Sequence, residues 1–187
     1  MKFITAILIL LLFLYTPWIV SGKSTNQREQ KGKATALNKS EIDSDFDGKI
    51  DQWIYYGKNG NMVKAEFDTN KDGNINHWEY YGKGSKIEKV EIDSNYDSQV
   101  DQWAYYSSNG QLIKKEFDTN EDKLPDQWEF YGKDEKLKRI EVDNNSDGKP
   151  DQWGHYKEGK LTKNEFDNNF DGKIDKREFY KKLKENH

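Results

Sequence analysis

Residues 41–65 read EIDSDFDGKIDQWIYYGKNGNMVKA, and this 25-residue unit recurs along the rest of the chain to give six copies. The same frame restarts at Glu66, Glu91, Glu116, Glu141 and, one residue early, Glu165. A fixed period of about 20 to 50 residues is typical of repeat proteins, whose units bury apolar side chains only against their neighbours. The sequence therefore predicts one array over residues 41–187.

The second half of each unit predicts a β-hairpin. Residues 53–56 are aromatic and β-branched, as is typical of strands, and Asn59-Gly60 is typical of a tight turn. Met62 to Phe67 then returns as a second strand. The predicted fold is mainly β, with tandem hairpins joined by loops, and it leaves open a flat sheet, a solenoid or a closed ring. Residues 179–184 contain no turn residue, so we expect a short C-terminal helix that caps the array.

The first half of each unit is a loop with oxygen-bearing side chains at alternate positions. Hard oxygen ligands at positions 1, 3, 5, 9 and 12, a backbone carbonyl from position 7 and glycine at position 6 wrap around Ca²⁺. Repeats two and six have this complete spacing. Their candidate ligands are Asp68, Asn70, Asp72, Asn74, Asn76 and Glu79, and Asp167, Asn169, Asp171, Lys173, Asp175 and Glu178.

The other four loops are less complete. Repeats one and five have Ile54 or Gly154 in place of the glutamate, and repeat three has Ala104 there. Lys123 and Ser98 replace the glycine in repeats four and three, which we therefore expect to be weaker sites. The candidate ligands are Asp43, Asp45, Asp47 and Asp51; Asp143, Asn145, Asp147 and Asp151; Asp118, Asn120, Asp122, Asp126 and Glu129; and Asp93, Asn95, Asp97 and Asp101.

One such cluster would be explained by a polar turn, because Asp, Asn and Gly dominate turns. Six clusters in register favour metal binding, because a divalent cation relieves the repulsion between carboxylates in one short loop. The glutamate that opens each repeat, two residues before the first aspartate, could be a further ligand or a surface charge at the end of a strand.

The loops resemble the calcium loops of EF-hands and of thrombospondin type 3 repeats. The Trp-x-Tyr-Tyr hairpins look like the repeats of bacterial cell-wall-binding modules, which implies recognition of choline or glucan. The tryptophans could instead pack in the core of the array, or form an exposed stripe that stacks on sugar rings or quaternary ammonium groups. They are Trp53, Trp78, Trp103, Trp128 and Trp153.

The first forty residues differ in composition from the array. An apolar run from Phe3 to Tyr15, followed by Pro17 and small residues from Val20 to Gly22, predicts a signal peptide over residues 1–22. The alternative is an uncleaved anchor helix over Phe3 to Val20. Residues 23–40 are polar and predict a disordered arm. The chain has no cysteine, so bound metal rather than disulfides would hold the short repeats together. We expect a secreted protein, extracellular or periplasmic, with no membrane span after cleavage.

Charge and composition limit the classes of function that the chain could have. The chain has 30 basic and 34 acidic groups, and residues 1–40 contain six of the basic groups but one of the acidic groups. The array is therefore acidic, which argues against nucleic acid as a partner. The three histidines are scattered and form no catalytic constellation, so no enzyme is expected.

These features predict a secreted calcium-binding repeat protein in which Ca²⁺ rigidifies a surface, adhesion or scaffold module. The expected partners are calcium ions and a protein or cell-surface glycan. A carbohydrate- or cell-wall-binding module that uses the tryptophans is the first alternative. An EF-hand calcium sensor is the second, and it is disfavoured because the segments between the loops are strand-like.

Overall fold

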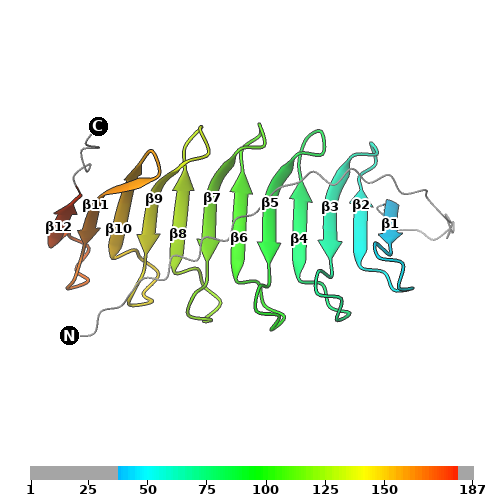
Figure 1. Cartoon of the computed structure of the whole chain (residues 1–187), viewed down its shortest axis with the longest axis horizontal. Helices are drawn as coiled ribbons and strands as arrows, with labels where there is room; N and C mark the ends of the chain where they lie inside the picture. Colours follow the sequence, from blue (N-terminus) through cyan, green and yellow to red (C-terminus); the bar gives the residue numbers. More distant parts are fainter. Residues whose placement is uncertain (1–37, 181–187) are drawn as a thin grey trace, which may run out of the picture. The chain divides into compact units, whose positions relative to one another are not determined.

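The computed structural model describes residues 38–180, which form one antiparallel sheet of twelve strands in the order of the sequence (Figure 1). Each strand therefore pairs with the strands before and after it in the chain. Among these residues there is no helix, and so none that could cross a membrane. The strands are β1 (Asn38–Ile42), β2 (Gln52–Tyr56), β3 (Met62–Phe67), β4 (His77–Tyr81), β5 (Ile87–Ile92), β6 (Gln102–Tyr106), β7 (Leu112–Phe117), β8 (Gln127–Tyr131), β9 (Leu137–Val142), β10 (Gln152–Lys157), β11 (Lys160–Phe166) and β12 (Lys176–Phe179).

The predicted hairpins are confirmed. The sequence left their arrangement undecided, and within residues 38–180 they form a single open sheet and not a closed ring. The described strands extend the predicted array at its N-terminal end. The array begins at Asn38, so three residues assigned to the arm belong to β1, where they pair with β2. The predicted signal peptide and the rest of the arm lie outside the described residues.

At the other end, Lys176–Phe179 forms the strand β12, of which Phe179 falls within the helix predicted over residues 179–184. β11 offers a free edge there, and Tyr180 N–H extends the pairing by donating to Thr162 O at 2.9 Å. Phe179 and Tyr180, the first two residues of the predicted helix, therefore pair with β11 instead. Residues 181–187 lie outside the described part of the chain.

The sheet has almost no apolar core. Within residues 38–180 only Ala65 and Val90 are buried hydrophobic residues, with 1% and 4% of their surface exposed. Most other strand residues are half-buried, because they are covered by their neighbours in the sheet and not by a second layer of described residues. Side-chain pairs between adjacent strands must therefore supply much of the stability.

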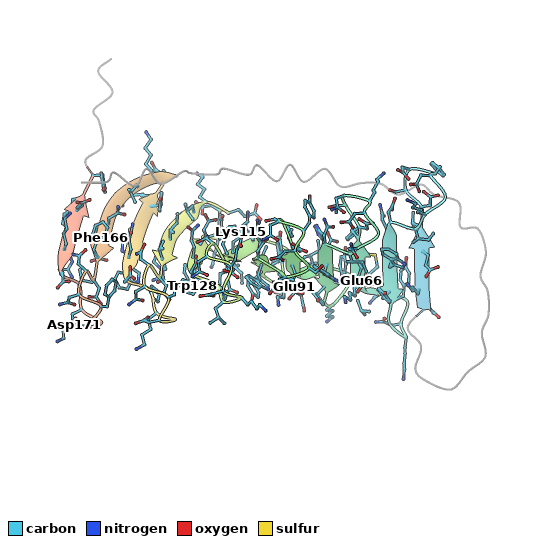
Figure 2. The ribbon with its side chains drawn as sticks, turned by 90° about the horizontal axis from the view of Figure 1, so that it is seen from below. Glu66, Glu91, Lys115, Trp128, Phe166 and Asp171 are labelled. Atoms are coloured by element: carbon cyan, nitrogen blue, oxygen red, sulfur yellow. The ribbon has the colours of Figure 1, made fainter. Side chains whose placement is uncertain are left out.

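One face of the sheet carries a regular pattern of such pairs, and we call it the tryptophan face. The register places Trp53 opposite Glu66, and Glu66 opposite Trp78 on its other side. In the next row along the strands, Tyr55 lies opposite Lys64. Figure 2 shows Glu66, Glu91 and Trp128 on this side of the sheet and Lys115 on the other.

Hydrogen bonds and cation–π contacts connect the two rows. Tyr55 donates to Glu66 Oε2 at 2.6 Å, and Lys64 Nζ lies 2.7 Å from Glu66 Oε1. Lys64 Nζ also lies 5.4 Å from the centre of the Tyr80 ring. The same arrangement recurs in the next two repeats, with the hydrogen bonds Tyr80–Glu91 and Tyr105–Glu116. The glutamate that opens these repeats is thus a partner of tyrosine and lysine within a strand, and not a charge at the end of one.

The phenol–carboxylate bonds predict a loss of stability at high pH. Hydrogen bonding to Glu66, together with burial and nearby charge, raises the pKa of Tyr55 from 10.0 to about 12. A phenol whose pKa is raised on folding stabilises the fold fully below its unfolded pKa, and this contribution disappears as the pH rises through the folded pKa. We expect Tyr55→Phe to lower the free energy of unfolding by about 1 kcal/mol near neutral pH. The difference in free energy of unfolding between the variant and the wild-type chain should decrease above the unfolded pKa and be lost as the pH rises through the folded pKa.

Urea unfolding at a series of pH values measures this effect. Tyr96→Phe is the control, because Tyr96 is exposed at a loop tip, and this substitution should leave stability unchanged. A Tyr55→Phe chain that matched the wild type at neutral pH would show that the bond does not stabilise the sheet.

Candidate metal centre

Six loops of nine residues lie at one end of the strands, and the short hairpin turns lie at the other end (Figure 1). This separation follows from the meander, because each loop joins an odd-numbered strand to the next even-numbered one. The loops are loop 1 (43–51), loop 2 (68–76), loop 3 (93–101), loop 4 (118–126), loop 5 (143–151) and loop 6 (167–175).

All six loops have the same backbone conformation. The fourth and sixth residues have positive φ, as at Phe46 with 65° and Gly48 with 92° in loop 1. Glycine adopts this conformation easily, whereas other residues pay on the order of 1 kcal/mol. Ser98 and Lys123 nevertheless keep it, with φ of 72° and 76°. Loops 3 and 4 therefore have the same shape as the others, although the sequence predicted them to be weaker sites.

The first aspartate of each loop holds the turn together. In loop 1, Asp43 Oδ2 accepts a hydrogen bond from Gly48 N at 2.8 Å, and Asp43 Oδ1 accepts one from Asp47 N at 3.2 Å. The bond to the sixth residue recurs in every loop, with Asp68, Asp93, Asp118, Asp143 and Asp167 as acceptors. The fifth residue accepts from the seventh, as Asp47 Oδ1 does from Lys49 N at 2.8 Å.

The ninth residue closes the loop by binding the second. Asp51 Oδ2 accepts from Ser44 N at 3.1 Å and from Ser44 Oγ at 2.7 Å. Asn76 closes loop 2 in the same way, accepting from Thr69 N at 2.9 Å. Equivalent bonds to the ninth residue are made by Asp101, Asp126, Asp151 and Asp175.

Loop 1 brings three carboxylates together. Asp43, Asp45 and Asp51 each offer an oxygen atom within 4.8 Å of the others, and within residues 38–180 this is the one such group of acidic or histidine side chains. Asp51 is 5% exposed, and its Oδ1 atom is buried without a hydrogen-bond partner. A buried, unpartnered carboxylate oxygen is costly unless a cation or another donor satisfies it. The arrangement is therefore suited to a hard cation.

The sequence explains why the group forms in loop 1. Position 3 is an aspartate there, Asp45, whereas the other five loops have asparagine: Asn70, Asn95, Asn120, Asn145 and Asn169. The other loops bring the same positions together through the same hydrogen bonds, with one carboxylate fewer at position 3. The aspartate at position 3, and not a glutamate at position 12, was the sequence signal for this cluster.

The glutamates at position 12 do not lie in the loops. Glu79 is in β4, where its Oε2 accepts from the Tyr81 hydroxyl and its Oε1 lies 3.3 Å from His77 Nε2. Burial raises the pKa of Glu79, but His77 and Tyr81 outweigh this effect and hold the pKa below its usual value. Glu129 accepts from the Tyr131 hydroxyl in β8, and Glu178 is 2.6 Å from Lys176 Nζ in β12. Because a strand and not a helix follows each loop, the chain carries these side chains into the sheet.

A lysine from the neighbouring loop reaches the carboxylate group, a contact that the spacing within one repeat does not predict. Lys71 Nζ of loop 2 contacts Asp45 Oδ2, and this hydrogen bond holds the pKa of Asp45 below its usual value. The signal lay in the repeat itself, because loops one period apart are side by side at the end of the sheet. A cation that binds in loop 1 would share Asp45 with this ammonium group or displace it.

The five tryptophans lie on the tryptophan face, one in each even-numbered strand from β2 to β10, and are half-buried. They are therefore neither a closed core nor a fully exposed stripe. Lys39 Nζ lies 5.7 Å from the centre of the Trp53 ring. The neighbouring Tyr80 ring has Lys64 and Lys89 at 5.4 and 6.0 Å from its centre.

Two acid-to-amide substitutions separate the roles of these groups. We expect Asp51→Asn to weaken calcium binding in loop 1 by about tenfold or more, because one ligand charge is lost. The loop should stay closed, since Asn76 already performs the same closure in loop 2. Glu79→Gln should leave calcium affinity within about twofold of the wild-type value. Calorimetric titration measures both, and a larger effect from Glu79→Gln than from Asp51→Asn would contradict this assignment.

Comparison with known proteins supports one part of this picture. A family model described as EF hand matches residues 159–184, which include loop 6. No curated protein matches the chain. The chain thus contains a single EF-hand-like calcium loop near its C-terminus, within a sheet of twelve antiparallel strands.

Proposed function

We propose that this chain is an exported calcium-binding repeat protein in which Ca²⁺ bound at the loops rigidifies one end of a long β-sheet. The main support for this proposal is the group of Asp43, Asp45 and Asp51, in which the buried Oδ1 atom of Asp51 has no hydrogen-bond partner. The EF-hand match at residues 159–184 supports calcium as the ion at the opposite end of the array.

The spacing of the three carboxylates fits a calcium ion. Ca²⁺ binds oxygen at about 2.3 to 2.6 Å, so two ligands on opposite sides of the ion are about 4.6 to 5.2 Å apart. The oxygen atoms of Asp43, Asp45 and Asp51 lie within 4.8 Å of one another. Two unit negative charges about 4 Å apart repel by about 1 kcal/mol even in bulk water, and a divalent ion would replace this repulsion with attraction. Asp47 and the carbonyl of Lys49 occupy the loop positions that would complete the coordination.

Calcium binding would matter for stability because the sheet has so little core. Extracellular calcium modules bind with dissociation constants of about 10⁻⁴ to 10⁻³ M. At about 1 mM free Ca²⁺, a site with a constant of about 10⁻⁴ M adds on the order of 1.4 kcal/mol to the free energy of unfolding. Several such sites would be a large part of the stability of a small domain.

The proposed role is a rigid, non-catalytic surface module for adhesion or scaffolding. Export rests on the apolar N-terminal segment, which lies outside the described residues. The carbohydrate-binding alternative has less support, because lysine ammonium groups already occupy the faces of the Tyr80 and Trp53 rings. The sensor alternative needs a pair of helices that opens on binding calcium, and residues 38–180 contain no helix.

A calcium titration of the chelator-stripped chain tests the proposal, with thermal unfolding followed by circular dichroism before and after. We expect calcium to bind and to raise the melting temperature by several degrees, whereas magnesium at the same concentration should have a smaller effect. Asp43→Asn should reduce both the number of bound ions and the rise in melting temperature. A chain that took up no calcium and melted at the same temperature with and without the ion would overturn the proposal.

A further inference from the structure

The sheet ends in two edge strands, β1 and β12, each paired on one side only within residues 38–180. An unpaired edge presents a row of backbone N–H and C=O groups that can pair with a strand of another chain. Natural proteins often block such edges with charged side chains. The charges on these two edges are arranged so that they match each other.

The matching follows from the repeat. At each inner junction between an even strand and the next odd strand, the register is fixed, as in Trp53 opposite Glu66 and Tyr55 opposite Lys64. β12 occupies the place of an even strand, with Arg177 opposite Glu165 and Phe179 opposite Lys163 on its paired side. β1 occupies the place of an odd strand, and it carries Lys39 and Glu41 at the lysine and glutamate positions.

We propose that β12 of one chain pairs with β1 of a second copy in this same register, so that the sheet continues from one molecule into the next. Arg177 would then lie opposite Glu41 of the second copy, and Phe179 opposite Lys39. The inference stands apart from the calcium proposal, because the contacts lie in the strands and not in the loops.

The end residues have the chemistry that this junction needs. Repeats one to five have tryptophan where β12 has Arg177, and arginine supplies a charge complementary to the glutamate it would face. Glu41 is 54% exposed, whereas its inner equivalent Glu66, flanked by strands on both sides, is 13% exposed. Phe179 is 72% exposed. The inner aromatic ring Tyr80 has a lysine on each side, and Lys39 of the second copy would supply a contact of this kind to Phe179.

The backbone at the loop end has a matching pair of groups as well. At each inner junction the N–H of the first loop residue donates to the carbonyl of the ninth residue of the preceding loop. Asp68 N donates to Asp51 O at 2.9 Å in this way, and Asp167 N to Asp151 O at 2.8 Å. Asp43 N–H of the second copy and the carbonyl of Asp175 are the equivalent groups across the proposed junction.

The assembly would be a linear chain of copies and not a closed dimer. The two edges are different surfaces, so pairing one with the other leaves a free β1 at one end and a free β12 at the other. The competing arrangement is a symmetric dimer through two β1 strands. Antiparallel pairing about Ser40 would also place Lys39 opposite Glu41, so the test must separate the two arrangements.

Exchanging the two charges of β1 distinguishes the linear assembly from the symmetric β1 dimer. The double variant Lys39→Glu and Glu41→Lys keeps the net charge and the ion pair within the strand, but it places lysine opposite Arg177. A symmetric β1 dimer would keep its opposite charges. Sedimentation velocity of the full chain, in a mild non-ionic detergent that disperses the apolar N-terminal segment, measures the assembly. We expect the wild-type mass to rise with concentration above the protomer mass of 22.1 kDa, and the exchanged variant to stay at that mass.

Disulfide trapping provides a second test that does not depend on charge. The chain has no cysteine, so Ser40→Cys and Glu178→Cys each introduce a unique thiol. These positions would lie opposite each other across the junction, as Ala65 lies opposite Ile54. We expect a disulfide-linked dimer when the two variants are mixed and little when either is oxidised alone. Concentration-independent mass with no mixed disulfide, or a dimer from Ser40→Cys alone, would overturn the proposal.

Discussion

The sheet has almost no core, so each strand is held by the strands beside it. Ala65 and Val90 are the buried hydrophobic residues within residues 38–180, and a layer with so little apolar burial gains little from the hydrophobic effect. The stabilising contacts are instead local to adjacent strands: Tyr55 with Glu66, Lys64 with Glu66, and Lys64 with the Tyr80 ring. The tyrosine–glutamate bond recurs every 25 residues in the first three repeats. Further along, Arg139 pairs with Glu141 and His155 with Glu165, so related pairs hold the rest of the array.

The loops complete this construction at one end of the strands. Each loop is closed by its own aspartate and asparagine side chains, which bind the backbone N–H groups of the turn, and its shape is the same whether position 6 is glycine, serine or lysine. This internal bonding uses one oxygen of the ninth residue and leaves the other without a protein partner at Asp51 and Asp101. A cation at such positions would satisfy the remaining oxygens within each loop, so metal binding and sheet stability are coupled in the proposed function.

Much of the architecture could be predicted from the sequence because the decisive signals are local and repeated. The turn at Asn59-Gly60 and the aromatic segment after each loop predicted the hairpins, and the alternate acidic residues predicted the loops. The prediction was wrong where pairing with an adjacent strand decides the outcome. Asn38–Ser40 looked like a polar arm but pairs with β2, and Phe179, the first residue of the expected C-terminal helix, pairs with β11.

The candidate site shows the same division between local and distant information. The loop positions 1, 3, 5 and 9 follow from spacing alone, but the place of position 12 depends on what comes after the loop. A helix would return Glu79 towards the ion, whereas the strand β4 places it beside Tyr81 and His77. The contact of Lys71 with Asp45 depends on how successive repeats lie side by side, and that arrangement was left open by the sequence.

The most direct test of the calcium account is an anomalous-difference map from crystals of the chain grown with calcium. We expect a peak in loop 1 with Asp43, Asp45 and Asp51 as ligands at about 2.3 to 2.6 Å, and with Glu79 outside any coordination sphere. A map with no peak at that group, in crystals that contain the folded sheet, would contradict the account and reduce loop 1 to a polar turn.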